Sequence, residues 1–415
     1  MKHSVSVTIP IHMMSICGVM IELICGDALH IPLADKTVQC VITSPPYYGL
    51  RDYGIGGQIG LEQSPEKYVA KMVDVFREVR RVLRDDGIVW LNLGDSYWGG
   101  KGSNACNDTH IDIRIAEGRT LQRPQTRIEG MKVLPTNGKH PIIKSKDMIG
   151  IPWRVAFALQ ADGWYLRSDI IWHKPNVMPE SIRDRPTKSH EYLFLLSKNK
   201  KYYYDQDAIR EPQDPKSLER MKHSWDGNSN RGYPGGSQNN IKKYMGKSDE
   251  EIAQLPGRNK RTVWTINNHG YSGAHFATFP LALVEPCLLA GSSERGCCPT
   301  CGKSWERVIE KTGEFVTTQY GKRNKSAPGQ LPHSVTRNGV IGTQIKTTFS
   351  WKQSCACLPA DPIPCTVLDP FAGTFTVGAI AAKHLRNAVG IELNPKYIEL
   401  ARQRNCDIKV MFGSS

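Results

Sequence analysis

The alternation of short apolar runs with segments of helical periodicity is the feature that most constrains this fold. Two short apolar runs, 21–24 and 38–43, end in turn residues, as buried parallel strands do. Five further segments are predicted as strands: 88–93, 168–172, 192–196, 367–369 and 388–393. Helical spacing of apolar residues marks 66–83, 151–163 and 376–384, and Asp85-Asp86-Gly87 predicts the end of the first helix. This order predicts an α/β fold, a doubly wound and mostly parallel sheet with helices on both faces.

The positive charge of the chain is concentrated in three polar segments. The net charge is +14, and segments 99–150, 199–261 and 302–353 carry excesses of four, four and six positive charges, so the rest of the chain is balanced. A neutral body with basic insertions is typical of an enzyme that binds a polyanion, because phosphate contacts supply most of the non-specific affinity. On charge alone, the alternative is that these loops are solvated and bind nothing.

The sequence also indicates where the protein works. No apolar run approaches the roughly 20 residues that span a bilayer. Residues 1–20 are mildly apolar, but His12 interrupts them and no small-residue cleavage site follows, so we expect a disordered or mis-started extension. A signal peptide is the alternative. Twelve cysteines without a secretory signal favour a reducing cytoplasm.

Ser44-Pro45-Pro46-Tyr47 directly follows the apolar run 38–43. The two prolines make a stiff ledge at the end of the predicted strand. The Ser44 hydroxyl and the Pro45 carbonyl are two acceptors that could bind the hydrogens of an aromatic amino group and draw its lone pair out of the ring. Tyr47 could stack on a base flipped out of a duplex. The alternative is a Pro-Pro turn that only closes a strand.

A second motif runs from Leu368 to Thr376 and places Gly373 in a turn between a strand and a helix. Glu392 ends the next predicted strand, 23 residues beyond Asp369. This is the arrangement of a nucleoside-binding βαβ unit, in which the second acidic residue accepts from ribose hydroxyls. A single glycine in the turn argues against a pyrophosphate loop, so a ligand without phosphate, such as S-adenosylmethionine, fits better. An ordinary strand–helix turn is the alternative.

Two cysteine pairs form a third candidate site. Cys298 and Cys301 form a knuckle, and Cys355 and Cys357 follow some fifty residues later. Four thiolates from two hairpins predict a closed, structural zinc site in a ribbon-like element. Four unrelated reduced thiols are the alternative, since the second pair has CxC rather than CxxC spacing.

Together these motifs resemble those of the β-class amino DNA methyltransferases of bacteria and phages, in which the catalytic half precedes the cofactor half. The resemblance extends from Ile21 to Arg404. Further matches follow in the family's order: Gly26-Asp27, Trp172-His173-Lys174-Pro175-Asn176, His190-Glu191-Tyr192, His275-Phe276-Ala277-Thr278-Phe279-Pro280 and Glu392-Leu393-Asn394-Pro395.

The resemblance implies roles for individual residues. It implies a catalytic motif at Ser44, Pro45, Pro46 and Tyr47, and cofactor contacts at Asp27, Thr278, Phe279, Asp369, Phe371, Gly373, Glu392 and Asn394. One position departs from the pattern, because Phe375 stands where the family usually has a second glycine. Its side chain would either narrow the methionine pocket or turn into the sheet.

The resemblance also implies a domain order. We expect a catalytic half at 21–198 with a basic insertion at 99–150, a target-recognition region at 199–261, the start of the cofactor half at 262–296, a zinc-ribbon-like insertion at 297–365 and the cofactor-binding half at 366–415.

The function implied is site-specific transfer of a methyl group from S-adenosylmethionine to N4 of cytosine in double-stranded DNA. Adenine-specific members of the family mostly carry Asp or Asn before Pro-Pro, whereas N4-cytosine members mostly carry Ser, as this chain does at Ser44. N6-adenine methylation is the alternative within the family. A catalytically degenerate, zinc-containing DNA-binding protein is the alternative from another class, and Phe375 is its support. A cognate restriction endonuclease is a further candidate partner.

Overall fold

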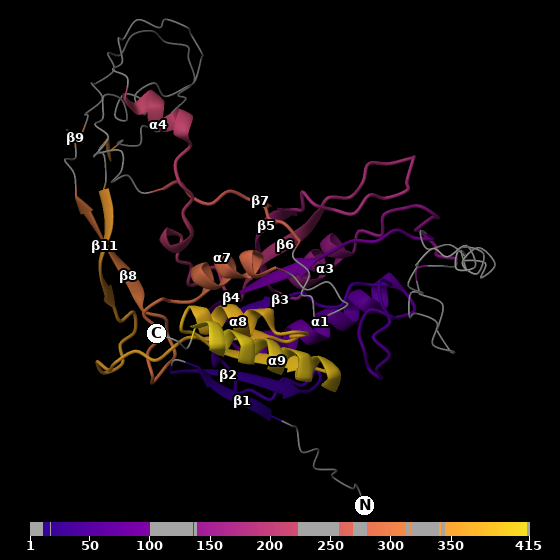
Figure 1. The fold of residues 1–415 in the computed structure, drawn as a ribbon, viewed down its shortest axis with the longest axis horizontal. Helices are drawn as coiled ribbons and strands as arrows, with labels where there is room; N and C mark the ends of the chain where they lie inside the picture. Colours follow the sequence, from indigo (N-terminus) through magenta and orange to yellow (C-terminus); the bar gives the residue numbers. More distant parts are fainter. Residues whose placement is uncertain are drawn as a thin grey trace, which may run out of the picture. The chain divides into compact units, whose positions relative to one another are not determined.

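The fold is built around one nine-stranded sheet (Figure 1). The structure is a computed structural model, which describes residues 11–16, 18–99, 136, 139–222, 257–268, 280–312, 316–317, 340–341 and 345–412. The strand order is β1-β2-β13-β12-β3-β4-β6-β5-β7. These strands span Ile11–Ile16 (β1), Val19–Cys25 (β2), Val38–Thr43 (β3), Leu83–Leu93 (β4), Tyr165–His173 (β5), His190–Ser197 (β6), Val263–Thr265 (β7), Thr366–Asp369 (β12) and Asn387–Glu392 (β13).

Most strands of this sheet are parallel. β2, β13, β12, β3 and β4 run parallel to one another, and β5 is parallel to β7. β1 pairs antiparallel with β2, and β6 pairs antiparallel with both β4 and β5. The seven strands predicted from the sequence correspond to β2, β3, β4, β5, β6, β12 and β13, and the expected α/β class is confirmed.

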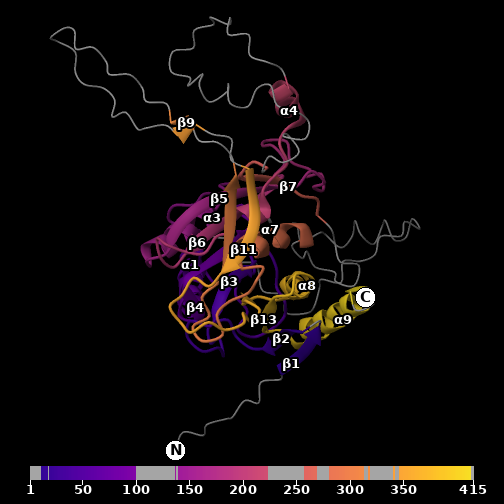
Figure 2. The same ribbon diagram turned by 90° about the vertical axis from the view of Figure 1, so that its left-hand side faces the viewer.

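Helices cover both faces of the sheet, as Figure 2 shows. α1 (Pro65–Val82) and α3 (Ile151–Ala161) lie on one face, and α7 (Leu281–Gly291), α8 (Thr376–Lys383) and α9 (Pro395–Phe412) lie on the other. Tyr68, Met72 and Phe76 of α1 are fully buried against the sheet, as their helical spacing predicts. Among the described residues, no helix combines the length and apolar character of a membrane span.

The first helix ends within one residue of its predicted end, and the segment predicted to stop it lies in the next strand. α1 stops at Val82, and β4 begins at once with Leu83, so Asp85-Asp86-Gly87 lies inside the strand rather than in a turn. The register explains how β4 accommodates this segment: Val38 pairs with Leu83 but Cys40 pairs with Ile88, so three extra residues bulge out of the ladder.

The N-terminal extension also differs from expectation. Residues 1–20 were expected to be disordered, but Ile11–Ile16 forms β1 and pairs along its whole length with β2. A turn at Gly18, with φ of +81°, allows this tight connection because glycine has no Cβ to clash there. β1 thereby covers the edge of β2 that would otherwise be unpaired. Residues 1–10 lie outside the described residues.

The strand order places a topological switch point between β3 and β12. From β3 the chain continues to β4 on one side, and from β12 it continues to β13 on the other side. The connections therefore diverge at the carboxyl ends of these two neighbours, which is where open α/β sheets bind their ligands.

The chain divides into two compact units. The first consists of residues 1–205, 261–305 and 353–415 and contains the sheet. The second consists of 206–260 and 306–352 and contains the 3-10 helix Asp207–Ile209, α4 (Pro215–Lys222) and two antiparallel pairs. These pair β8 (Glu306–Thr312) with β11 (Ile345–Lys352), and β9 (Val316–Thr317) with β10 (Val340–Ile341). Within the expected target-recognition region, 223–256 lie outside the described residues, as do most of residues 100–138 in the first basic insertion.

Candidate active site

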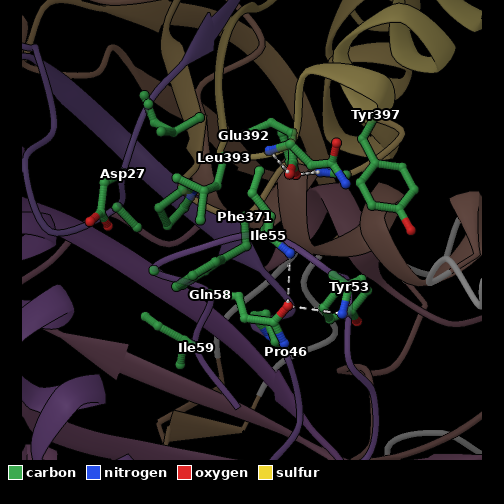
Figure 3. Close-up of a pocket in the computed structure, with 18 of the residues that line it drawn as sticks. Asp27, Pro46, Tyr53, Ile55, Gln58, Ile59, Phe371, Glu392, Leu393 and Tyr397 are labelled. Carbon is green, nitrogen blue, oxygen red and sulfur yellow. Dashed lines mark hydrogen bonds between the residues drawn. The ribbon is translucent and has the colours of Figure 1, made fainter. Parts of the chain in front are cut away.

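A cavity opens at the switch point, where β2, β3, β12 and β13 end (Figure 3). Of the predicted site residues, Asp27, Ser44, Pro46, Phe371, Gly373, Glu392 and Asn394 line it. They come from four separate stretches of the chain and meet because parallel strands end at one edge of a sheet. Pro45, Tyr47 and Asp369 lie beside the cavity rather than in its lining.

Glu392 forms one wall of the cavity and fixes the turn opposite it. Its Oε2 accepts from the Gly373 backbone N–H at 2.8 Å, and its Oε1 accepts from that of Asn394 at 2.8 Å. Burial raises the pKa of Glu392, although these backbone donors oppose the shift. Each oxygen keeps a lone pair for a ligand hydroxyl, so Glu392 can both shape the turn and bind a ribose.

The opposite walls combine an acid with apolar and aromatic groups. Asp27 follows β2, and its Oδ1 accepts from the Leu29 backbone N–H at 3.0 Å. The segment after the Pro-Pro ledge contributes Tyr53 and Gln58, whose Oε1 accepts from the Tyr53 backbone N–H at 2.9 Å (Figure 3). The Tyr53 ring lies edge-on to that of Tyr397 from α9, with centroids 6.2 Å apart. Tyr53, Gln58 and Tyr397 were not predicted as site residues, because no sequence motif marks them.

Asp369 is fully buried behind the cavity and joins β12 to β3. Its Oδ1 accepts from the Thr43 hydroxyl at 2.8 Å and from the Phe371 backbone N–H at 3.1 Å. Its Oδ2 has no hydrogen-bond partner among the described residues. Burial raises the pKa of Asp369 to about 7. Asp369 therefore positions the residues before Ser44 and the turn after β12 instead of facing a ligand.

Ser44 belongs to a hydrogen-bond network with residues of β4 and β6. The Tyr47 hydroxyl donates to Glu191 Oε2 at 2.6 Å. Asn92 Nδ2 donates to the Tyr47 hydroxyl oxygen at 2.8 Å and to Ser44 Oγ at 3.2 Å. Ser44 Oγ and the Tyr47 hydroxyl oxygen are 3.5 Å apart. Burial, followed by the Glu191 carboxylate, raises the pKa of Tyr47, so its hydroxyl stays protonated.

The ledge that carries Ser44 is held from both sides. The Tyr68 hydroxyl of α1 donates to the Pro46 carbonyl at 2.9 Å, and Pro45 is buried. The Tyr47 ring lies against Gly94, where a Cβ would come within 2.4 Å of it. Only glycine permits this approach, which fixes the ring and hence the hydroxyl.

Comparison with known proteins places the chain in a family. The profile described as DNA methylase, which covers N6 and N4 methyltransferases, matches residues 38–298 and 365–403. The chain belongs to the N6/N4 DNA methylase family. It is 37% identical over 381 residues to the Type II methyltransferase M.Cfr9I of Citrobacter freundii, covering 91% of this chain and 85% of that protein. It is 37% identical over 386 residues to M.SmaI of Serratia marcescens, covering 92% and 90%. Among solved structures, PvuII DNA methyltransferase (cytosine-N4-specific) matches 94% of this chain and 91% of its own, with 14% identity and a TM-score of 0.46.

In this methylase, the unusual Phe375 turns away from the cavity. It is fully buried and has a φ of +54° as the N-cap of α8. Its ring fills the space over two other glycines, since a Cβ at Gly378 or Gly390 would come within 2.6 or 2.7 Å of it. The Phe375 side chain was expected either to narrow the methionine pocket or to turn into the sheet, and the structure shows the second position. The cofactor turn itself keeps Gly373, with a φ of +52°, at the cavity wall.

The methylase also brings the four predicted cysteines together. The Sγ atoms of Cys298, Cys301, Cys355 and Cys357 all lie within 4.8 Å of one another. Backbone N–H groups, that of Cys301 first, lower the pKa of Cys298 to about 6. Gln353 Nε2 lies 3.2 Å from Cys355 Sγ and donates to the Cys357 carbonyl at 2.8 Å. Four thiols in this arrangement fit a tetrahedral Zn²⁺.

This cysteine cluster is anchored at the sheet edge opposite the cavity. Gln39, near the start of β3, donates through Nε2 to the Gly302 carbonyl at 2.9 Å and accepts through Oε1 from the Thr366 N–H at 2.7 Å. Arg84 of β4 donates to the Cys301 carbonyl. Ser44 follows the other end of β3, so a metal bound here would stay away from the reaction.

Two predicted cofactor residues, Thr278 and Phe279, lie outside the described residues. Sequence reasoning also missed Asn92 and the role of Glu191. Glu191 had been read only as part of a family motif, and a network joining residues 44, 92 and 191 has no local sequence pattern. The signal that could have found them is polar identity at the cavity end of buried strands, since Asn92 is almost fully buried in β4.

Proposed function

We propose that this chain is an S-adenosylmethionine-dependent DNA methyltransferase that methylates N4 of cytosine in duplex DNA. The observation that carries the proposal is the junction of two half-sites in one cavity. The cofactor turn, with Gly373 and Glu392, forms one side, and Ser44 with Pro46 opens into the other.

The cavity suits a nucleoside with an amino-acid tail. Glu392 would accept from the ribose hydroxyls, and Gly373 lets the turn approach the ligand closely. Phe371 and Tyr397 offer apolar and aromatic contact, and Asp27 offers an acceptor at the end of β2. When bound, S-adenosylmethionine supplies an electrophilic methyl group on a sulfonium. The chain holds this group next to the ledge that bears Ser44.

Ser44 and the Pro45 carbonyl would orient the amino group of a base extruded from the duplex. Ser44 Oγ can accept one amino hydrogen, which localises the lone pair on nitrogen for in-line attack. The rest of the ledge holds this acceptor still, through Tyr68 on the Pro46 carbonyl and Gly94 under the Tyr47 ring. Tyr47, which lies beside the cavity, would stack on the extruded base.

Cytosine is favoured over adenine because residue 44 is a neutral hydroxyl. The Glu191 carboxylate already lies at the end of the same network, 2.6 Å from the Tyr47 hydroxyl. A second carboxylate at position 44 would place two like charges in one partly buried network. Among the amino DNA methyltransferases that this chain resembles, N4-cytosine members mostly carry Ser at this position. N6-adenine remains the alternative product.

The test is mass spectrometry of nucleosides from DNA methylated by the protein. We expect N4-methylcytosine, reduced at least about a hundredfold by Ser44→Ala because the amino group loses its acceptor. Ser181→Ala, at an exposed serine of the β5–β6 loop, is the control and should leave the product unchanged. Finding N6-methyladenine alone would contradict the base assignment, and no methylated base at all would contradict the enzyme assignment.

We further propose that the cysteine cluster holds a structural Zn²⁺ and that residues 199–261 read the target sequence. The support for zinc is the set of four thiols whose sulfur atoms lie within 4.8 Å of one another, with Gln353 beside them. The support for target reading is the basic excess of that segment and its position between the two halves. A cognate restriction nuclease is a proposed partner, because relatives such as M.SmaI are Type II methyltransferases.

A further inference from the structure

The hydrogen-bond network behind Ser44 has a fixed direction. The Glu191 carboxylate can only accept, so the single hydrogen of the Tyr47 hydroxyl points to Glu191 Oε2, 2.6 Å away. Tyr47 then has no hydrogen left for Ser44. In the 3.5 Å contact between these hydroxyls, Ser44 is therefore the donor and Tyr47 the acceptor.

Asn92 is compatible with the same direction, because its Nδ2 can only donate. Its two hydrogens have three acceptors within reach: the Tyr47 hydroxyl oxygen at 2.8 Å, Glu191 Oε2 at 3.1 Å and Ser44 Oγ at 3.2 Å. Ser44 is left with one lone pair facing the cavity, which can accept an N–H of the base. Ser44 and Tyr47 can thus each accept a hydrogen bond from the cavity side and donate one toward Glu191 in β6.

We infer that Glu191 is the proton acceptor of the methyl transfer, reached from the base through Ser44 and Tyr47. This inference rests on the proposed function. It identifies the group that takes up the proton released by N-methylation. Neither Ser44 nor Pro45 fills this role alone.

The transfer balances along this row. The amino nitrogen forms a bond to the methyl carbon as the carbon–sulfur bond breaks, so the sulfonium charge becomes one surplus proton on nitrogen. That proton passes to Ser44 Oγ, the Ser44 hydrogen passes to the Tyr47 oxygen, and the Tyr47 hydrogen passes to Glu191 Oε2. Both hydroxyls end neutral, the carboxylate ends as a carboxylic acid, and the methylated amine ends neutral.

Basic side chains lie around Glu191. Lys174, which follows β5, forms an ion pair with Glu191 Oε1 on the side away from Tyr47. Lys188 and His190 lie within electrostatic reach, and Lys188 Nζ is buried without a hydrogen-bond partner among the described residues.

The first experiment measures single-turnover methylation with protein, cofactor and target duplex pre-assembled, so that binding does not limit the rate. We expect Glu191→Gln to lower this rate about a hundredfold, the usual contribution of a positioned base. Tyr47→Phe, which leaves the Lys174 ion pair in place, should cost about the same, and the double variant no more than either single one. Glu180→Gln, a matched change in the loop between β5 and β6, is the control.

Chemical rescue separates proton transfer from a structural role. Glu191→Ala opens space for a small acid, so added formate or acetate should restore its rate at least tenfold, whereas Tyr47→Phe should not respond. Calorimetry with S-adenosylmethionine verifies that each variant is folded and binds the cofactor.

Three outcomes would overturn the inference: an unchanged rate in Glu191→Gln, additive losses in the double variant, or no rescue of Glu191→Ala. If Ser44→Ala is still inactive in that case, the inference fails alone. If Ser44→Ala is fully active, the proposed function fails as well.

Discussion

At the scale of single residues, Asp369 is a carboxyl group that is fully buried in the fold. One carboxyl oxygen accepts from Thr43 and Phe371, and the other has no partner among the described residues. A buried, half-satisfied carboxylate is costly, which is why burial raises the pKa of Asp369 to about 7. The native state therefore retains a proton that the unfolded chain has already lost at lower pH.

This difference predicts a pH-dependent stability. Because the folded-state pKa lies above the unfolded value, the contribution of Asp369 falls as pH rises from about 4 to about 7 and is constant above that. Asp369→Asn keeps the acceptor for Thr43 but cannot ionise. Its stability relative to wild type should rise across this range by at most roughly 4 kcal/mol.

Urea denaturation of both proteins at several pH values between 4 and 8 measures this difference. Asp361→Asn, at an exposed aspartate outside the site, is the matched control and should follow the wild-type curve. A difference between Asp369→Asn and wild type that does not vary with pH would contradict the prediction.

Single residues also show which parts of the site could be predicted from the sequence and which could not. Ser44, Gly373 and Glu392 were predictable because each follows an apolar strand at a characteristic spacing, and all three line the cavity. Asn92 and Glu191 were not assigned roles, since their contacts with Tyr47 join positions 45 and 144 residues apart. Side-chain hydrogen bonds of this range depend on strand order, which no local pattern encodes.

At the scale of elements, α8 is flanked at both ends by a non-glycine residue with a positive φ, and the two side chains differ in burial. Phe375 before the helix and Leu385 after it both have a positive φ, of +54° and +58°. This conformation costs a non-glycine residue roughly 1–2 kcal/mol. The Phe375 ring is fully buried beside Gly378 and Gly390, whereas the Leu385 side chain is 55% exposed. Burial compensates the strain at one end only.

Glycine substitutions should therefore act in opposite directions. Phe375→Gly relieves the backbone but leaves a large cavity, so we expect destabilisation by about 2–4 kcal/mol. Leu385→Gly relieves the same strain, completes a glycine C-terminal cap and loses little packing, so we expect stabilisation by about 1 kcal/mol. Thermal unfolding of the two variants is the measurement. Stabilisation by Phe375→Gly would mean that its ring contributes nothing to the core.

The elements themselves were largely predictable, for a physical reason. Strands such as β3 and β12 are buried on both faces, so their sequences are continuous apolar runs. The strands of this sheet that were missed are β1 and β7, which lie at its two edges. An edge strand has one solvated side and, in β7, only three residues, Val263–Thr265. Composition alone does not distinguish such segments from loops.

At the scale of the whole molecule, the cysteine cluster joins distant parts of the chain. Its two pairs are separated by residues 302–354, which include β8 and β11. A tetrathiolate zinc site would close this long loop, and loop closure is a large part of what such sites contribute to folding. We expect about one zinc per chain by elemental analysis, and loss of that zinc in Cys298→Ser.

The control for the zinc prediction is Cys25→Ser, since Cys25 is a free thiol outside the cluster. That variant should retain the metal. Treatment of wild type with a strong chelator should lower its unfolding temperature, because binding energy to the native state is lost. A fully folded, metal-free preparation of the wild-type protein would contradict the prediction.

The order of strands in the sheet also has a consequence for biosynthesis. β12 and β13 lie between β2 and β3, although about 320 residues separate the end of β3 from the start of β12 in the chain. At translation rates of roughly 5–20 residues per second, β2 and β3 are synthesised about 15–65 seconds before these two neighbouring strands. Each exposes one unpaired apolar edge during that time. A nascent chain stalled before residue 366 would thus be a target for chaperones and proteases rather than a partly active enzyme.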